Sequence, residues 1–175
     1  LLWQTQANPK KYWFSFNKGL VLNCIKTDAC DLHLVPQILT QKVPALEFDT
    51  KTLIELDNLK ENDAVGFTMM GTNYTYIEIK RIDNKLELSL YEGSFNTHDI
   101  CVFKEEYQDN KIILGLKARN EAIYDLRYQY TINGKEIEKS YLASAGRWIG
   151  ATYGLYARGN GGSALVKYFN TTKLK

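Results

Sequence analysis

The chain of 175 residues is 45% hydrophobic, and its 22 basic and 20 acidic residues leave a net charge of +2. This apolar content is typical of a folded protein, and the length suits a single domain with a substantial core. The near balance of charge gives no electrostatic attraction to nucleic acid, and no apolar run approaches the roughly 20 residues of a membrane-spanning helix. We therefore expect neither nucleic acid nor a membrane among its partners.

Turn residues divide the first half of the chain into short strand patterns. The motifs Asn8-Pro9 and Asn17-Lys18-Gly19 flank the aromatic segment YWFSF, and both are typical turn sequences. Pro36 and Pro44 lie at the edges of segments, where a missing backbone N–H matters least. The strands predicted in this half cover residues 20–25, 38–42, 48–56, 64–70 and 74–81.

Two hairpin turns organise the second half. Asp83-Asn84 and Asn133-Gly134 each follow a strand pattern, and Asn-Gly is the strongest short hairpin signal. Residues 93–99 are predicted to form a looser loop. The segment RGNGGS (158–163) lies between two strands, lacks the helix N-terminus that phosphate loops use, and is predicted to be a mobile connection. The strands predicted in this half cover residues 85–91, 101–103, 111–119, 122–132, 150–157 and 164–169.

Strict alternation of apolar and polar residues decides the fold class. In residues 122–132 it places one set of side chains on a single face of a strand, and no apolar period of about 3.6 residues persists for three turns anywhere in the chain. We predict an all-β protein of two packed sheets, a jelly-roll sandwich, with Leu114, Leu116, Leu126 and Leu155 in its core. The set on that face is Tyr124, Leu126, Tyr128, Tyr130 and Ile132.

The cysteines and histidines show no catalytic or metal-binding pattern. Cys24, Cys30 and Cys101 are an odd number without a C-x-x-C motif, so a structural zinc is not expected. Two alternatives stay open for Cys24: a small buried hydrophobe, or a disulfide with Cys30. His33 and His98 lie in no recognisable nucleophile or metal motif. Taken alone, the chain does not have the sequence of an enzyme.

Six colinear segments nevertheless resemble one family, the C-terminal concanavalin A-like domain of family 43 glycoside hydrolases, which are β-xylosidases and α-arabinofuranosidases. Together these segments extend over nearly the whole chain. They are Trp3-Gln4 with Asn8-Pro9 and Trp13-x-Ser15, residues 38–42 (ILTQK), 56–66 (LDNLKENDAVG), 74–80 (YTYIEIK), 128–134 (YQYTING), and 146–157 (GRWIGATYGLYA) followed by 162–169.

The resemblance implies a concanavalin A-like sandwich that has no catalytic residues of its own. In this family the acid and base carboxylates belong to an N-terminal five-bladed propeller, on which the sandwich packs. The expected partners are therefore a propeller of the same polypeptide and, through it, xylo- or arabino-oligosaccharides. The opening LLWQTQ, without Met or signal-like segment, suits one accessory domain, residues 1–175, excised from a longer, periplasmic or secreted glycosidase.

The chain also departs from the family pattern. Thr5 and Ala7 replace a Trp and a His in the opening motif. Leu165 and Lys167 replace two Asp residues near the C-terminus, so a calcium ion borrowed from related sandwiches is not expected, and we predict no cofactor.

Trp148, with the adjacent Arg147, is the main candidate for contact with sugar or for the pocket mouth. Both follow Gly146 in a turn-like approach to a strand, and related β-xylosidases place an aromatic of this domain near the catalytic pocket. The alternative is that Trp148 plugs the end of the sandwich or packs on the propeller. Trp3 and Trp13 are predicted to be core residues.

The stripe of Tyr124, Tyr128 and Tyr130 is the second candidate, because aromatic faces with polar tips suit sugar rings. Its alternative is the inner face of the sandwich. For the whole chain, the leading hypothesis is a non-catalytic accessory domain of a family 43 glycosidase. A self-sufficient carbohydrate-binding module and a structural sandwich that mediates protein contacts stay open as alternatives.

Overall fold

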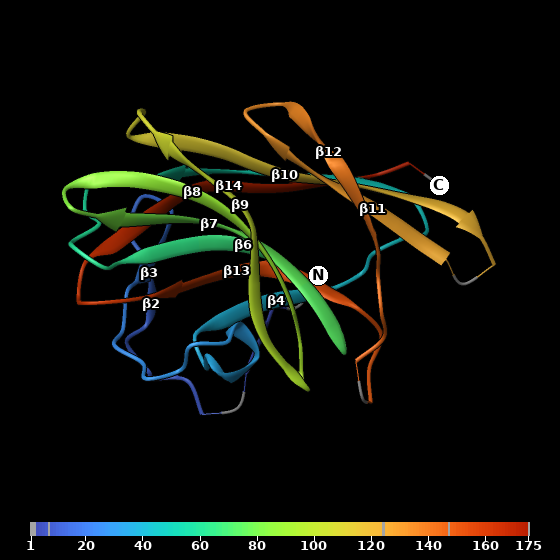
Figure 1. The fold of residues 1–175 in the computed structure, drawn as a ribbon, viewed down its shortest axis with the longest axis horizontal. Helices are drawn as coiled ribbons and strands as arrows, with labels where there is room; N and C mark the ends of the chain where they lie inside the picture. Colours follow the sequence, from blue (N-terminus) through green and yellow to red (C-terminus); the bar gives the residue numbers. More distant parts are fainter. Residues whose placement is uncertain (1–2, 7, 124, 147, 175) are drawn as a thin grey trace.

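The computed structural model describes residues 3–6, 8–123, 125–146 and 148–174. Its described residues form fourteen strands in two seven-stranded sheets, and a single turn of 3₁₀ helix, η1 (Leu32–Leu34), is the one helical element among them. The prediction of an all-β sandwich is thus confirmed (Figure 1). No helix in the described ranges is long and apolar enough to cross a membrane.

Neighbouring strands in each sheet run antiparallel. The first sheet has, in spatial order, β1 (Gln4–Thr5), β4 (Ile38–Lys42), β13 (Thr152–Arg158), β6 (Ala64–Met70), β7 (Asn73–Ile82), β8 (Lys85–Ser94) and β9 (Thr97–Tyr107). The second has β12 (Lys135–Leu142), β11 (Asp125–Ile132), β10 (Lys111–Ala122), β5 (Phe48–Glu55), β14 (Ser163–Lys173), β3 (Leu20–Asn23) and β2 (Phe14–Phe16).

The main core lies between the two sheets, and the period-two pattern predicts most of its members. Leu114, Leu116 and Leu155 are fully buried there, as predicted. Leu126 is only half-buried and packs against the edge of this core, since its position near the start of β11 lies at the rim of the sandwich. The hairpin turns are confirmed as well, because Asn84 and Asn133 adopt the positive φ that tight hairpins require.

A second apolar cluster lies outside the first sheet, where residues 24–37 cross its outer face. This explains why β6 (AVGFTMM) is buried at every position and shows no alternation: it is covered on both faces. The buried members of this cluster are Leu32, Val35, Ile38, Met70, Tyr74, Tyr76 and Tyr156.

Two segments differ from the sequence prediction. Residues 93–99 do not form a loose loop: β8 continues to Ser94 and β9 begins at Thr97, joined by a short turn. β9 and β12 are the edge strands of their sheets and carry mostly exposed side chains. Their ladders are formed by the backbone, so apolar alternation gives little signal for them.

The three cysteines differ in their exposure to solvent. Cys24 is buried in the main core, whereas Cys30 and Cys101 are exposed, and all three are free thiols. Burial raises the pKa of the Cys24 thiol, so it stays protonated. The buried-hydrophobe alternative therefore holds for Cys24, and the disulfide with Cys30 is not formed.

Candidate functional site

The connection between β12 and β13, residues 143–151, positions Trp148. The hydroxyl and backbone N–H of Thr72 both donate to the carbonyl of Ala145, at 2.9 and 3.0 Å. The Ser144 hydroxyl donates to the carbonyl of Asn73 at 2.8 Å and accepts from its N–H at 2.9 Å. These four bonds fix the start of the connection to the β6–β7 turn, at one end of the first sheet.

Trp148 itself points away from the sandwich. Its side chain is 90% exposed, and that of the next residue, Ile149, is also exposed. Leaving apolar surface in water costs about 25 cal/mol per Å², so an indole this open is an unusual use of a large apolar side chain. Trp148 does not plug the end of the sandwich. Arg147 lies outside the described residues.

Two neighbouring connections bring further exposed apolar side chains to the same end. Phe95, in the β8–β9 turn, donates its backbone N–H to the carbonyl of Thr72 at 3.2 Å, and its ring lies 5.3 Å from that of His33. Leu34 follows His33 in η1 and is also exposed. We call Leu34, Phe95, Trp148 and Ile149 the end face. The β8–β9 turn and the β12–β13 connection both reach the bottom of the view in Figure 1.

The end face was only partly predictable. The sequence singled out Trp148 but missed Leu34 and Phe95. Both are isolated apolar residues in segments that contain turn residues, and no periodicity marks them. Their exposure shows only once the connections are placed side by side.

A carboxylate holds two of these connections together. The side chain of Asp99, at the start of β9, accepts hydrogen bonds from the hydroxyls of Tyr74 and Tyr76, at 2.5 and 2.7 Å. It also accepts the backbone N–H of Leu32 in η1 at 2.7 Å. Burial, with Asp99 close by, raises the pKa of Tyr74, so its hydroxyl remains a donor at neutral pH.

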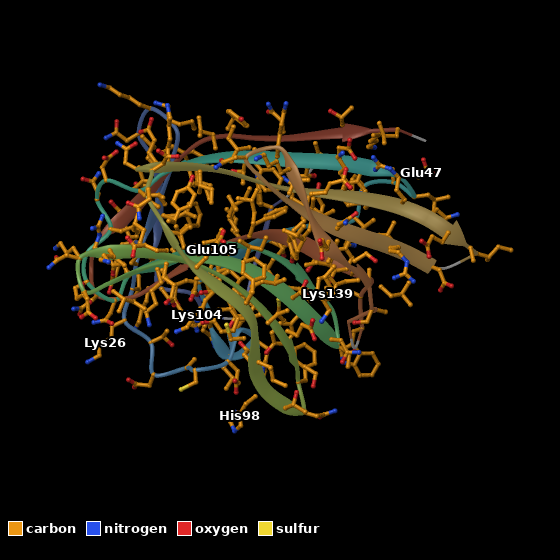
Figure 2. All side chains as sticks on the ribbon, turned by 45° about the horizontal axis from the view of Figure 1, so that its top comes forward. Lys26, Glu47, His98, Lys104, Glu105 and Lys139 are labelled. Carbon is orange, nitrogen blue, oxygen red and sulfur yellow. The ribbon has the colours of Figure 1, made fainter. Side chains whose placement is uncertain are left out.

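Asp31 completes this arrangement from the other side. Its carboxylate accepts the backbone N–H of Asp99 and a hydrogen bond from His98 Nδ1, both at 2.9 Å. The hydrogen bond from the Asp99 N–H is the main reason why the pKa of Asp31 lies below its usual value. His98 otherwise extends into solvent, at the lower margin of the molecule in Figure 2. We call Asp31 and Asp99 together the strap clasp, because their hydrogen bonds fasten residues 24–37, the segment over the outer face of the first sheet, to β9.

Both histidines therefore have structural partners. Because Tyr74 donates its single hydroxyl proton to Asp99, His33 Nδ1 must be the donor in its 2.8 Å contact with the Tyr74 oxygen. Within the described ranges, no group of three or more His, Cys, Asp or Glu side chains could hold a metal ion.

The tyrosine stripe requires a correction. Tyr128 is 3% exposed and Tyr130 is fully buried, and both hydroxyls contact Thr75 Oγ1, at 2.8 and 2.9 Å. Burial raises both pKa values, so both phenols stay neutral. Their rings pack between the sheets and offer no face to a sugar. The inner-face alternative is correct for these two residues, and Tyr124 lies outside the described residues.

The tryptophans divide between core and surface. Trp13 is fully buried, as predicted. The prediction for Trp3 is wrong: it is 36% exposed, because it lies just before the short edge strand β1 of the first sheet. Its ring meets that of Phe169 edge-on, with 4.8 Å between the centroids.

The glycine-rich connection between β13 and β14 is anchored rather than mobile. The buried carboxylate of Asp63 accepts the N–H groups of Asn160 and Gly162, the latter at 2.8 Å, and that of Lys60 at 2.7 Å. A Cβ on Gly162 would lie 2.0 Å from Asp63 Oδ2, so this residue must be glycine for the carboxylate to fit. The loop therefore binds a side chain of its own fold.

Comparison with known families decides the relationship. Residues 1–172 match the family of β-xylosidase C-terminal concanavalin A-like domains. The chain belongs to this family. No curated protein sequence matches it.

Solved structures agree on the fold of this family member. It superposes on an engineered family 43 glycoside hydrolase, one that displays both endo-xylanase and exo-arabinofuranosidase activity, with a TM-score of 0.81 and 16% identity, covering 98% of this chain and 38% of that one. For a bifunctional GH43-CE protein of Bacteroides eggerthii the TM-score is 0.78 with 18% identity, covering 100% and 24%. The carbohydrate-binding module CBM66 of Bacillus subtilis gives 0.58 and 10%, covering 98% and 95%.

These identities establish the fold alone. The β-xylosidase C-terminal-type domain spans between 24% and 38% of the length of the first two enzymes. The two catalytic activities of the engineered enzyme are properties of a much longer chain.

Proposed function

We propose that this chain is a non-catalytic accessory domain of a family 43 glycoside hydrolase that acts on xylan- or arabinan-type polysaccharide. The observation that carries the proposal is the family match over residues 1–172. In this role the domain packs on a catalytic propeller of the same polypeptide and supports it. Trp148, with Arg147 beside it, contacts the propeller or the mouth of its pocket.

The end face supports this role. Three connections present four exposed apolar side chains at one end of the sandwich, and exposed apolar side chains gathered at one end favour a site of association. The strap clasp and the bonds from Thr72 and Ser144 hold these connections in place before any partner arrives. A preformed surface loses little conformational entropy on docking, which favours binding.

The carboxylates support the absence of catalysis. The buried Asp63 and the partly buried Asp99 accept backbone and tyrosine hydrogen bonds, and the buried Glu78 accepts from the Tyr156 hydroxyl at 2.8 Å and from Arg158 at 3.0 Å. A general acid or nucleophile needs an open approach to the substrate. These three are each committed to holding segments of the fold together.

A hydrolysis assay tests the first half of the proposal. The chain alone, given nitrophenyl β-xyloside and nitrophenyl α-arabinofuranoside, is expected to release no nitrophenol above a heat-denatured sample. Activity that persists through repurification and is lost on substitution of Asp or Glu in this chain would refute the proposal.

A substitution tests the second half, in a polypeptide that joins this domain to a family 43 propeller. Trp148→Ala is expected to weaken activity on xylo-oligosaccharides or to release the two domains from each other in limited proteolysis. The matched control is Ile123→Ala, an equally open apolar residue in the β10–β11 turn. If the two variants have equal activity and equal resistance to proteolysis, Trp148 does not have the proposed role.

The carbohydrate-binding module remains a second candidate, because an open indole also suits the apolar face of a sugar. Calorimetry of the chain with xylohexaose separates the two candidates. Binding that Trp148→Ala abolishes would favour a module that binds sugar by itself.

A further inference from the structure

A hollow of about 420 Å³, with none of the end-face residues in its lining, lies where β4 of the first sheet approaches β14, β3 and β2 of the second. Residues from β2, β3, β4, β14, the β2–β3 turn and the segment before β1 line it, so both sheets contribute. Its volume falls within the range of about 300–1,000 Å³ that small-ligand sites occupy. The lining residues are Trp3, Phe16, Asn17, Lys18, Gly19, Leu20, Gln41, Val166, Lys167, Tyr168 and Phe169.

Two exposed aromatic side chains line the hollow from different segments. Trp3, immediately before β1, is 36% exposed, and Phe16, on β2, is 78% exposed. The indole of Trp3 is held by the ring of Phe169, which it meets edge-on with 4.8 Å between centroids. Phe16 contacts Phe14 in the same manner at 6.2 Å. Both rings are therefore supported from behind while keeping surface open to a ligand.

A buried amide provides the polar group. Gln41 lines the hollow from β4 and is only 5% exposed. Its Oε1 accepts a hydrogen bond from the Tyr153 hydroxyl at 3.4 Å, and no acceptor for its amide nitrogen occurs in the part of the chain that the structure describes. The nitrogen is not among the buried polar atoms that lack a partner, so it is accessible from the hollow and can donate to a ligand that enters there.

The wall opposite is a tight, preformed turn. Lys18 and Gly19 both have positive φ, at 55° and 145°. A Cβ on Gly19 would come within 2.6 Å of the carbonyl oxygen of Val166, so only glycine allows this turn to lie against β14. The hollow is therefore shaped by the backbone and does not depend on a ligand to form.

The chemistry of the lining selects the class of ligand. Aromatic faces suit the C–H side of a pyranose ring, while an amide and lysine ammonium groups bond its hydroxyls. No carboxylate lines the hollow among the described residues, which disfavours a cation or a basic peptide. A purely apolar contact would leave the amide of Gln41 unpaired.

We propose that this hollow, the side groove, binds an oligosaccharide of pyranose units through Trp3, Phe16 and Gln41. The site is separate from Trp148 and does not rest on the accessory role proposed above. Within such a role it would add a second contact with the polysaccharide, at a distance from the catalytic pocket.

Titration of the whole chain with xylohexaose and with cellohexaose, followed by calorimetry and by retention in gels that contain soluble xylan, tests the proposal. We expect measurable binding of at least one of the two. Trp3→Ala and Phe16→Ala should each weaken it at least tenfold, and Ile123→Ala, in the β10–β11 turn, should leave it within twofold. Phe16 is the safer variant for folding, because its side chain is the more exposed, and near-ultraviolet circular dichroism checks both.

Three results would overturn the side groove. The first is absence of binding to both oligosaccharides and to xylan. The second is binding that Trp148→Ala abolishes while Phe16→Ala leaves it intact, which would support the end face instead. The third is a dimer in sedimentation that Phe16→Ala dissociates, which would make the groove a contact between copies of the chain.

Discussion

The two connections that flank β13 differ in what fixes them. The glycine-rich connection after β13 is tied to the interior by the buried carboxylate of Asp63, and its polar groups are used inside the fold. The connection before β13 is fixed at its start by the bonds of Thr72 and Ser144 and at its end by the Val43 N–H, which donates to the carbonyl of Ala151, and between these points it presents Trp148 to solvent. A loop whose groups are all used internally is structural, whereas one that leaves a large apolar side chain open is available to a partner.

A substitution in β13, the strand between these connections, should have the largest effect on stability. Leu155 is fully buried in β13, and Leu155→Ala is expected to lower the free energy of unfolding by about 2–5 kcal/mol, because it leaves a cavity between the sheets. Urea denaturation measures this. A loss below about 1 kcal/mol would show that the inner and outer faces of β13 are assigned incorrectly.

The next largest effect on stability is expected from Asp63, the residue that anchors the connection after β13. Asp63→Asn replaces one of the two acceptor oxygens by an amide NH₂ group. The single oxygen that remains cannot accept from the N–H groups of Asn160, Gly162 and Lys60 together. A buried donor without an acceptor costs about 1–3 kcal/mol, so we expect at least this loss in urea denaturation. The exposed Asp109→Asn is the control, with a change within about 0.5 kcal/mol.

The strap clasp offers a third, pH-dependent comparison. The N–H of Asp99 holds the pKa of Asp31 below the usual value of about 3.9, so the carboxylate stabilises the fold above that pH. This contribution is lost as the pH falls from about 4 through the folded-state pKa. Wild-type protein should therefore lose more thermal stability between pH 5 and pH 3 than Asp31→Asn does.

Parallel melting curves of the two proteins measure this difference, and equal slopes between pH 5 and pH 3 would contradict it. Hydrogen exchange localises the effect. The amide of Asp99 should lose protection first, since it donates directly to Asp31.

The smallest effect on stability belongs to Trp148. Because its indole makes so little contact with the fold, Trp148→Ala should change the free energy of unfolding of the chain by no more than about 0.5 kcal/mol. Urea denaturation of Trp148→Ala and of Leu155→Ala under the same conditions measures both changes, and the loss in Leu155→Ala provides the scale. Unfolding of this variant would place the indole in the core and remove the contrast between the two connections.

Much of the fold was predictable from local pattern. The alternation in residues 111–119 and 122–132 identified the core face of β10 and β11, and Asn133-Gly134 identified a hairpin, because side-chain period and positive φ are properties of a few adjacent residues. The open indole of Trp148 was also anticipated in part, from its place in a turn next to Gly146.

Other features depend on residues that are distant in sequence, and only the tertiary structure decided them. An aromatic side chain is buried at Tyr130 and exposed at Trp3, because Tyr130 lies between the sheets and Trp3 lies just before an edge strand. Asp63 and Gly162 are 99 residues apart, and Asp31 and Asp99 are 68 apart, so no local period relates them. The sequence by itself determined the inner strands, the hairpin turns and the residues of the two-sheet core that follow strict alternation. Which loops are anchored, which aromatics face water and where a groove opens depend on packing between sheets, which only the folded chain establishes.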